Sequence, residues 1–204
     1  MSADLQTVFV VDDDTSVCKS LLRLLNSAGH RAESFTCAED FLARWESDPV
    51  PGCVLVDLQM PGLDGLQLQE RLQTAEQSVP IIFITGHGDI PTSVKAMKAG
   101  AVDFLSKPLQ DEDLLEAIQE ALQRDQRDRI VQSEQAVIQR RYATLTPRER
   151  EVMALVVRGM LNKQIAYDLG ASEKTIKIHR GRVMQKMKVQ SVADLVRAAG
   201  QIDK

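Results

Sequence analysis

Short apolar runs alternate with longer stretches of helical pattern over roughly the first 120 residues, and this alternation limits the fold more than any other feature of the sequence. The apolar runs span residues 8–11, 32–35, 53–56, 81–84 and 102–105. Continuous apolar runs of this length are typical of strands that are buried on both faces of a sheet. The helical stretches between them span residues 15–27, 38–45, 65–76 and 91–98. Strict strand–helix alternation with five strands predicts a parallel, doubly wound α/β sheet of flavodoxin-like type.

After residue 111 the pattern becomes helical and then strongly polar. Apolar residues recur at helical spacing at positions 114, 115, 118, 121 and 122, and residues 123–129 are dense in charge and free of glycine and proline. This pattern predicts a last helix that continues, with or without a break, as a helical linker over residues 123–141. A disordered tether is the alternative. We therefore expect a first domain over residues 1–122 and a second over residues 142–204.

The C-terminal segment has no strand pattern, and capping signals divide it into short helices. Thr146, Pro147 and Glu149 have the spacing of an N-cap, a first helical residue and the N3 residue of a capping box. Glycines that can end helices stand at positions 159 and 170, and Ser172 can begin one. The four predicted helices span residues 147–158, 162–169, 173–187 and 191–199. Together they predict a small all-α domain.

The formal charge is divided unevenly between the two parts of the chain. Residues 144–204 carry 12 Lys or Arg and 6 Asp or Glu, a net charge of +6, whereas the preceding 143 residues carry 13 and 23, a net charge of -10. A basic segment of this size indicates a polyanion as partner, and an acidic segment can hold a cation. The alternative is two solvated surfaces of opposite sign.

Composition and cysteine usage limit the class of protein. Hydrophobic residues make up 44% and charged residues 26%, as in an ordinary globular protein. No apolar run approaches the ~18–20 residues of a membrane-spanning helix, and residues 1–7 carry no basic apolar leader. Cys18, Cys37 and Cys53 are odd in number and lack the spacing of a metal site, so we expect inert, half-buried thiols in a reducing cytoplasm.

Polar residues follow four of the five predicted strands at the point where each strand ends. They are Asp12, Asp13 and Asp14 after the first run, Asp57 after the third, Thr85 after the fourth and Lys107 after the fifth. Ligands of a doubly wound sheet gather beyond the carboxyl ends of its strands, because these ends meet at one edge. We therefore expect these separate segments to form a single acidic site.

The residue types at this edge favour phosphoryl chemistry. Several carboxylates in a partly dry site repel one another and need a counter-charge, and oxygen ligands of this kind suit Mg²⁺. Lys107 can neutralise a phosphoryl oxygen, and the Thr85 hydroxyl can donate a hydrogen bond to one. Asp57 can then act as a nucleophile, since phosphoryl transfer depends on positioning and charge neutralisation more than on a base. A single strand-end aspartate can also be a helix cap or turn residue, the role we expect for Asp14.

Four segments resemble the receiver signature of response regulators. They are VDDD at 11–14, VDLQMPG at 56–62, ITGHG at 84–88 and FLSKP at 104–108, and the resemblance covers about residues 6–122. It implies a CheY-like fold in which Asp57 is the phosphoacceptor and a sensor histidine kinase is the phosphoryl donor. The implied ligands of Mg²⁺ (or Mn²⁺) are Asp12, Asp13, Asp57 and the backbone carbonyl of Gln59. Thr85 and Phe104 match the switch pair, and Lys107 matches the phosphate contact. His87, between two loop glycines, is expected to be a surface residue and not a phosphocarrier.

The third helix of the C-terminal segment has two distinct faces. Ile176, Val183 and Met187 recur at helical spacing and should pack inward, whereas a basic stripe contains Lys174, Lys177, Arg180 and Gly181. A short basic helix with one apolar side can enter the major groove of DNA while its back packs on a supporting helix. Asn162 and Lys163, at the start of the preceding helix, can meet a phosphate. The alternative is a solvated basic face.

This segment resembles the LuxR-type helix-turn-helix of the FixJ/NarL regulators over about residues 142–199. The resemblance lies in LTPREREV at 145–152, NKQIA at 162–166 and TIKIHR at 175–180. By position it implies that Lys177 and Ile178 face DNA bases, with Lys174, Thr175 and Arg180 nearby and Lys163 at the backbone. Gly181 departs from the longer base-contacting side chain of some relatives. The implied partner is double-stranded promoter DNA, bound by a dimer on paired half-sites, with RNA polymerase as a further partner.

Together the resemblances imply a transcriptional regulator in which phosphorylation promotes promoter binding. We expect phosphorylation to act by dimerisation through the surface of the fourth helix, the fifth strand and the fifth helix of the first domain. We expect no enzymatic activity beyond self-phosphorylation and slow autodephosphorylation, and no membrane partner. One alternative is an acidic-pocket phosphohydrolase of the haloacid-dehalogenase type, which usually carries a second acid two residues after the nucleophile, where Gln59 stands. A second alternative is a receiver-like adaptor without DNA binding.

Overall fold

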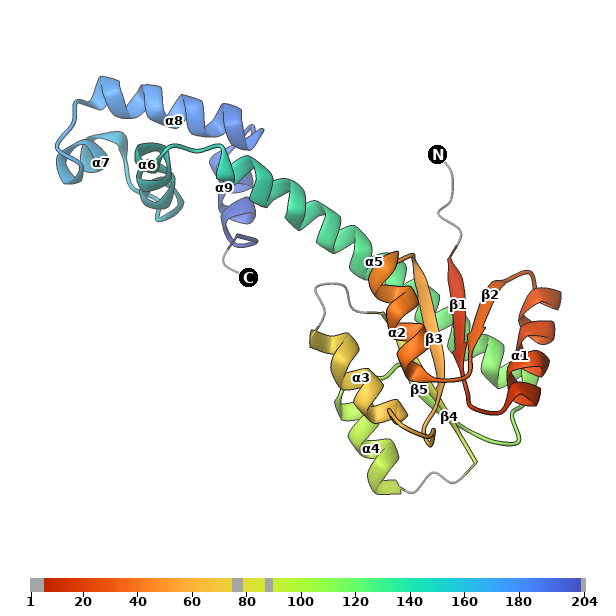
Figure 1. Cartoon of the computed structure of the whole chain (residues 1–204). Coiled ribbons are helices and arrows are strands. Elements are labelled where there is room, and N and C mark those ends of the chain that lie inside the picture. Colours follow the sequence, from red (N-terminus) through yellow and green to blue (C-terminus); the bar gives the residue numbers. More distant parts are fainter. Residues whose placement is uncertain (1–5, 75–78, 87–89, 203–204) are drawn as a thin grey trace. The chain divides into compact units, whose positions relative to one another are not determined.

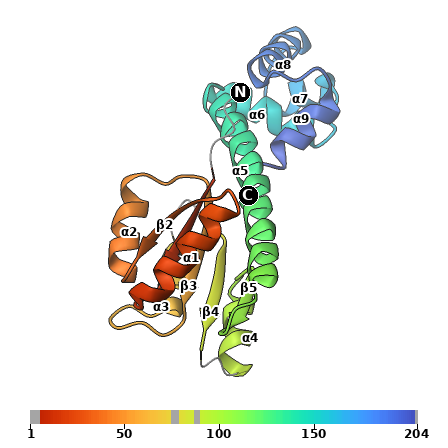
Figure 2. The same cartoon turned by 90° about the vertical axis from the view of Figure 1, so that its right-hand side faces the viewer.

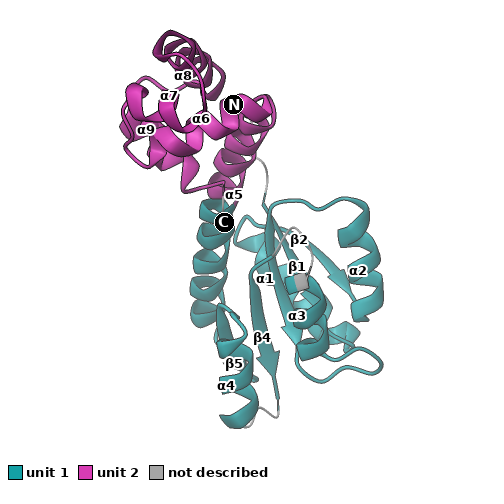
Figure 3. Cartoon of the chain, turned by 90° about the vertical axis from the view of Figure 1, so that its left-hand side faces the viewer, with its two compact units in different colours: residues 1–128 teal, residues 129–204 magenta. Residues whose placement is uncertain are grey.

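A five-stranded parallel sheet in the order β2-β1-β3-β4-β5 lies at the centre of the first of two compact units, residues 1–128 (Figures 1 and 3). The strands are β1 (Thr7–Val11), β2 (Arg31–Phe35), β3 (Gly52–Asp57), β4 (Ile81–Thr85) and β5 (Asp103–Ser106). Each lies within one residue of its predicted range at either end. The predicted flavodoxin-like arrangement is therefore confirmed.

The structure, a computed structural model, describes residues 6–74, 79–86 and 90–202. The end of the helix predicted over residues 65–76 lies outside this part of the chain. The surface position expected for His87 lies outside it as well.

Helices cover both faces of the sheet because side chains alternate along each strand. They are α1 (Thr15–Ser27), α2 (Ala38–Ser47), α3 (Gly65–Thr74), α4 (Ile90–Lys98) and the first half of α5 (Asp111–Ala143). One core cluster joins Phe9, Val54 and Phe83 to α2, α3 and α4, and the other joins Val10 and Leu55 to α1 and α5. Figures 1 and 2 show α1 and α5 on the face opposite to α2 and α3. This two-sided burial keeps the strand ends free to meet at one edge.

The two edge strands differ from the sequence prediction. All residues of β1, β3 and β4 are buried, as expected, but those of β2 and β5 are only partly buried or exposed. The prediction of strands buried on both faces was therefore wrong for β2 and β5. They are the first and last strands in the sheet order, so each lacks a neighbour on one side.

Helix α5 runs unbroken from Asp111 to Ala143 and enters both compact units, which meet in sequence between residues 128 and 129. The disordered tether considered from the sequence is therefore wrong. Inside the first unit, Asp125 of α5 is buried and accepts a hydrogen bond from the backbone nitrogen of Gly52 at 3.0 Å. This contact ties α5 to the start of β3.

The second unit, residues 129–204, is helical throughout its described part (Figure 3). Its elements after α5 are α6 (Pro147–Val157), α7 (Asn162–Asp168), α8 (Glu173–Met187) and α9 (Val192–Ala199). Thr146 forms the predicted capping box with Glu149, and the Ser172 side chain caps α8 as expected. The core includes Ile165, Ile176 and Leu195, and Ile138 and Tyr142 near the end of α5 pack against it.

Within the described residues, no helix combines the length and apolarity needed to traverse a bilayer. Cys18, Cys37 and Cys53 are free thiols. The expected half-buried position is found for Cys37 but was wrong for Cys18 and Cys53, which are buried because they face the sheet core. Burial raises the pKa of the Cys53 thiol, which disfavours the reactive thiolate. These features agree with the expectation of unreactive thiols.

Candidate functional site

Three carboxylates meet at the carboxyl edge of the sheet. Asp12, Asp13 and Asp57 each place one carboxylate oxygen within 4.8 Å of the others. Asp12 and Asp57 are buried and Asp13 is exposed. They come together because β1 and β3 are adjacent, with Val11 opposite Val56, so the residues that follow share one edge. The structure thus brings together the acidic residues singled out from separate strand ends.

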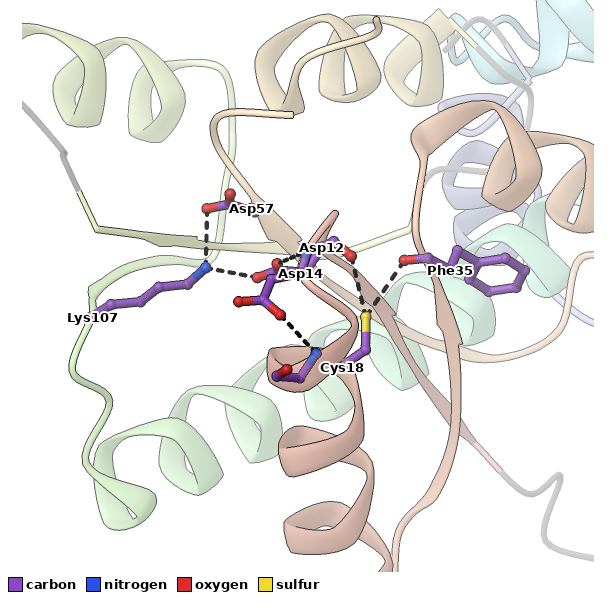
Figure 4. A network of polar contacts seen from close by, with 7 residues as sticks. Asp12, Asp14, Cys18, Phe35, Asp57 and Lys107 are labelled. Carbon is purple, nitrogen blue, oxygen red and sulfur yellow. Dashed lines mark hydrogen bonds and ion pairs between the residues drawn. The ribbon is translucent and has the colours of Figure 1, made fainter. Parts of the chain in front are cut away.

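Lys107, just beyond β5, supplies the positive charge of this pocket (Figure 4). Its Nζ lies 2.7 Å from Asp12 Oδ2 and 3.5 Å from Asp57 Oδ1. The Lys107 backbone nitrogen donates to the Thr85 carbonyl at 2.7 Å, which fixes the strand end that carries it. One ammonium group is therefore shared between two buried carboxylates.

Burial and charge oppose each other in this pocket. Burial raises the pKa of Asp57, the neighbouring Lys107 charge opposes this rise, and the nearby Asp12 carboxylate adds to it. Burial alone would lower the pKa of Lys107, but its contacts with Asp12 and Asp57 together raise it. The pocket therefore keeps a protonated lysine, while a buried carboxylate remains only partly neutralised.

Asp14 has a different role from the two aspartates before it. Its Oδ1 accepts a hydrogen bond from the Ser16 backbone nitrogen at 2.7 Å and caps α1 (Figure 4). This hydrogen bond lowers the pKa of Asp14. The expected capping role is confirmed.

The remaining predicted pocket residues lie on neighbouring segments. Thr85 ends β4 and is 1% exposed, and Phe104 of β5 is half-buried with its ring centroid 6.1 Å from that of Phe83. Gln59 is exposed in the loop between β3 and α3, two residues after Asp57. Thr85 and Gln59 lie at or just after strand ends on the edge that carries the acidic cluster, whereas Phe104 lies within β5, opposite Phe83 of β4.

Sequence reasoning missed a contact beneath the carboxylates. Cys18 Sγ lies 3.2 Å from the carbonyl oxygen of Asp12 and 3.7 Å from that of Phe35, so the thiol can donate to the ends of both β1 and β2 (Figure 4). Cys18 shares the buried face of α1 with Leu21 and Leu25. That spacing was visible in the sequence, but the hydrogen-bond partners of the thiol were not.

In the second unit, α8 presents polar and basic residues opposite its packed face. Ile176, Val183 and Met187 are buried, as predicted. The predicted contact residues Lys174, Thr175, Lys177 and Ile178 are exposed, as is Lys163 of α7. Arg180 is half-buried, and its Nη1 donates to Asn162 Oδ1 at 3.0 Å. A side chain built at Gly181 would meet open space, so this position leaves the surface of α8 bare.

Two family descriptions match the two parts of the chain. Residues 8–119 match the response regulator receiver domain, and residues 143–199 match the bacterial regulatory proteins of the luxR family. The chain belongs to the response regulators with a LuxR-type DNA-binding domain. The resemblances found in the sequence are thereby confirmed.

Relatives and solved structures support this assignment over nearly the whole response regulator. The chain is 48% identical to Nodulation protein W of Bradyrhizobium diazoefficiens over 93% of its own length and 83% of that relative. It is 43% identical to the transcriptional regulatory protein FixJ of Rhizobium meliloti over 95% and 94% of the two chains. The response regulator StyR aligns with a TM-score of 0.82 and 46% identity over 96% of this chain and 98% of that chain.

The family assignment decides between the alternatives left open by the sequence. Response regulators of this type are transcriptional regulators and not classical enzymes. The family therefore does not support the alternative of an acidic-pocket phosphohydrolase. The second alternative was an adaptor without DNA binding. The LuxR-type match assigns a DNA-binding domain to residues 143–199 and so argues against it. This response regulator therefore combines a receiver with a DNA-binding domain.

Proposed function

We propose that Asp57 of this response regulator accepts a phosphoryl group from a sensor histidine kinase. The observation that carries the proposal is the charge arrangement around Asp57: two further carboxylates lie within 4.8 Å, and the Lys107 ammonium lies 3.5 Å away. Such a cluster is unfavourable without added positive charge, and it offers only hard oxygen ligands, which suit Mg²⁺ or Mn²⁺. Asp12, Asp13, Asp57 and the Gln59 carbonyl would hold this ion, which when bound neutralises charge on the phosphoryl oxygens.

The chemical step uses Asp57 as the nucleophile. One of its carboxylate oxygens attacks phosphorus, the P–N bond of the kinase phosphohistidine breaks, and an acyl phosphate forms while the electron pair stays on the imidazole. Lys107 turns its ammonium from the carboxylates to a phosphoryl oxygen, and the Thr85 hydroxyl donates to another. Because Lys107 already lies against Asp57, only a small movement of its side chain is required.

The proposed switch uses Thr85 at the end of β4 and Phe104 of the neighbouring strand β5. When the Thr85 hydroxyl binds the phosphoryl group, the loop after β4 moves inward, and Phe104 turns into the space left behind. This changes the surface of α4, β5 and the start of α5. Helix α4 carries an exposed apolar stripe at helical spacing, with Ile90 80%, Val94 45% and Met97 43% exposed. We propose that two phosphorylated chains dimerise through this surface.

Dimerisation couples phosphorylation to promoter binding. Helix α8 enters the major groove of double-stranded DNA, and the proposed contact residues are Lys163, Lys174, Thr175, Lys177, Ile178 and Arg180. Two such domains in one dimer bind paired half-sites, because the first contact raises the effective concentration of the second domain. RNA polymerase is the proposed further partner at the promoter, and the cytoplasm is the proposed location.

The test compares wild type with Asp57→Ala, using acetyl phosphate and Mg²⁺. Sedimentation should show donor-dependent dimers of wild type only, and gel shifts on a duplex selected by the wild-type protein from a random pool should show donor-dependent binding. Asp14→Ala, altered in the neighbouring capping residue, is the control and should respond like wild type. If Asp57→Ala dimerises and binds DNA in response to the donor, the proposed function is wrong.

A further inference from the structure

A side-chain hydrogen bond joins the two helices that carry the proposed DNA contacts. Arg180 of α8 donates from Nη1 to Oδ1 of Asn162, the first residue of α7, at 3.0 Å. Both residues are half-buried, although they are 18 positions apart in sequence. The contact therefore fixes the Arg180 side chain against the neighbouring helix before any ligand is present.

This restraint distinguishes Arg180 from the other proposed contacts. The side chains of Lys163, Lys174 and Lys177 are exposed, and each must be ordered when DNA binds. Long cationic side chains lose considerable rotamer freedom on binding, whereas a side chain held in advance loses less. Arginine has five N–H donors in a planar group, so one bond to Asn162 leaves the others for a ligand.

The same bond determines which groups Asn162 and Arg180 offer to a ligand. The Asn162 amide oxygen accepts from Arg180, so the amide nitrogen is directed away from the guanidinium. Arg180 then presents its remaining N–H groups and its positive charge to a ligand, while the Asn162 oxygen is directed toward the guanidinium. A group with several anionic acceptor oxygens fits this arrangement, and a phosphate diester is such a group.

We propose that Asn162 is a positioning residue for Arg180, whose guanidinium binds one backbone phosphate of DNA. The proposal rests on the DNA-binding function proposed above for α8, and it assigns Arg180 to the DNA backbone instead of the base edges. Asn162 acts through Arg180, so its contribution disappears when the arginine is absent.

The experiment is a double-mutant cycle on the full chain with acetyl phosphate and Mg²⁺. The dissociation constant for a short fluorescein-labelled duplex, selected by the wild-type protein from a random pool, is measured by anisotropy over a series of salt concentrations. Arg180→Ala should weaken binding about 10-fold and reduce the salt slope by about 1. Asn162→Ala should weaken binding roughly 3- to 10-fold in the wild-type background. In the Arg180→Ala background it should have no further effect.

Lys163→Ala is the matched control, because Lys163 is the exposed neighbour of Asn162. The fold-increase in the dissociation constant caused by Lys163→Ala should be the same in wild type and in Arg180→Ala, as expected for independent phosphate contacts. Thermal unfolding of each variant checks the fold, and Asn162→Ser replaces Asn162→Ala if the latter does not fold.

Three results would count against this assignment. If Asn162→Ala weakens the Arg180→Ala protein as much as it weakens wild type, Asn162 does not act through Arg180. If Arg180→Ala binds the duplex as tightly as wild type, Arg180 is not a phosphate contact, although DNA binding by α8 stands. If the wild-type protein selects no duplex at all, the proposed DNA-binding function fails.

Discussion

The two proposed functional surfaces of this response regulator hold their charges in opposite ways. In the receiver pocket, Asp12 and Asp57 are buried at strand ends and share one lysine. On α8, Lys174 and Lys177 extend into solvent from a helix that is held by its buried apolar face. Groups in the pocket depend strongly on one another, because charges interact more strongly when they are shielded from water. We therefore expect a single substitution in the pocket to remove most of the phosphorylation activity, and a single substitution on α8 to weaken DNA binding only in part.

The largest effect is expected for Asp13→Asn. Removing this charge from the carboxylate cluster should slow phosphorylation of Asp57 by acetyl phosphate and Mg²⁺ by up to about 1,000-fold, as for loss of one preorganised charge-stabilising group. Asp14→Asn is the matched control, because asparagine also caps helices well, and its rate should stay within about twofold of wild type. The phosphorylated fraction is followed over time by mass spectrometry at several Mg²⁺ concentrations. Equal losses of phosphorylation rate in both variants would mean that the segment between β1 and α1 acts only through its total charge.

The next comparison separates the two faces of α8. Ile176→Ala should destabilise the second unit by about 3 kcal/mol, because it leaves a cavity in a fully buried site. Lys177→Ala, one residue later and exposed, should change stability by less than about 0.5 kcal/mol, yet weaken DNA binding about 10-fold. Urea unfolding followed by circular dichroism measures the first quantity, and anisotropy measures the second. A large stability loss in Lys177→Ala would contradict this division of the helix.

The receiver pocket could be predicted from sequence because its residues are placed by the backbone. The apolar runs show where each strand ends, and parallel topology brings those ends to one edge, so the positions of Asp57 and Lys107 follow without knowledge of side-chain packing. The caps by Asp14, Thr146 and Ser172 were predictable for the same local reason.

The missed contacts depend on packing between elements that are distant in sequence. The Asn162–Arg180 bond and the Cys18 contact with Asp12 require particular rotamers on two elements, which neither periodicity nor spacing specifies. The partial exposure of β2 and β5 was missed although the sequence carries a signal for it. Glu33 and Ser34 interrupt the apolar pattern of β2, and Asp103 that of β5, unlike in the central strands. Whether α5 was continuous could not be decided, since its polar middle fits a solvated helix as well as a tether.

The stability of each unit should depend on pH through one buried carboxylate, and the two dependences should have opposite signs. The first of these carboxylates is Asp57 in the receiver. Burial raises the pKa of Asp57, so its contribution to stability is present below the ordinary carboxyl value of about 4 and is lost as pH rises through the raised value. Asp57→Asn should therefore raise the thermal midpoint of the receiver by a few degrees at neutral pH without Mg²⁺. The fluorescence of Trp45, which is buried in the receiver core, reports this transition. A lower midpoint than wild type would mean that attraction to Lys107 outweighs the burial of the charge.

Glu149 in the second unit should behave in the opposite way. Its hydrogen bond with Lys186, at 2.6 Å, lowers its pKa, so the stability it contributes is present above about 4 and is lost as pH falls through the lowered value. Glu149→Gln should lower the midpoint of the second unit by a few degrees at neutral pH, and the difference from wild type should shrink in acid. Circular dichroism measures this change. A pH-independent difference would mean that the glutamate acts through its capping geometry and not its charge.

The smallest expected effect lies at the start of α7, where Leu161 occupies the N-cap position without a capping side chain. Its backbone is extended, it is 69% exposed, and its backbone nitrogen already donates to Gln164 Oε1 at 2.8 Å. The Gln164 backbone nitrogen donates to the Leu161 carbonyl at 2.9 Å, and the hydroxyl of Leu161→Thr would offer it a side-chain acceptor as well and so complete a capping box. We expect a gain of about 0.5–1 kcal/mol in the free energy of unfolding of the second unit.

Leu161→Ala is the control for this gain, because it removes the exposed leucine without adding an acceptor. If alanine stabilises the unit as much as threonine, the gain comes from removing apolar surface and not from capping. DNA affinity should change by less than about twofold in both variants, since neither alters a cation or the Asn162–Arg180 bond. A larger loss of DNA affinity in Leu161→Thr would show that the start of α7 changes conformation when DNA binds. The cation-bearing surface of the second unit would then be held less rigidly than its core.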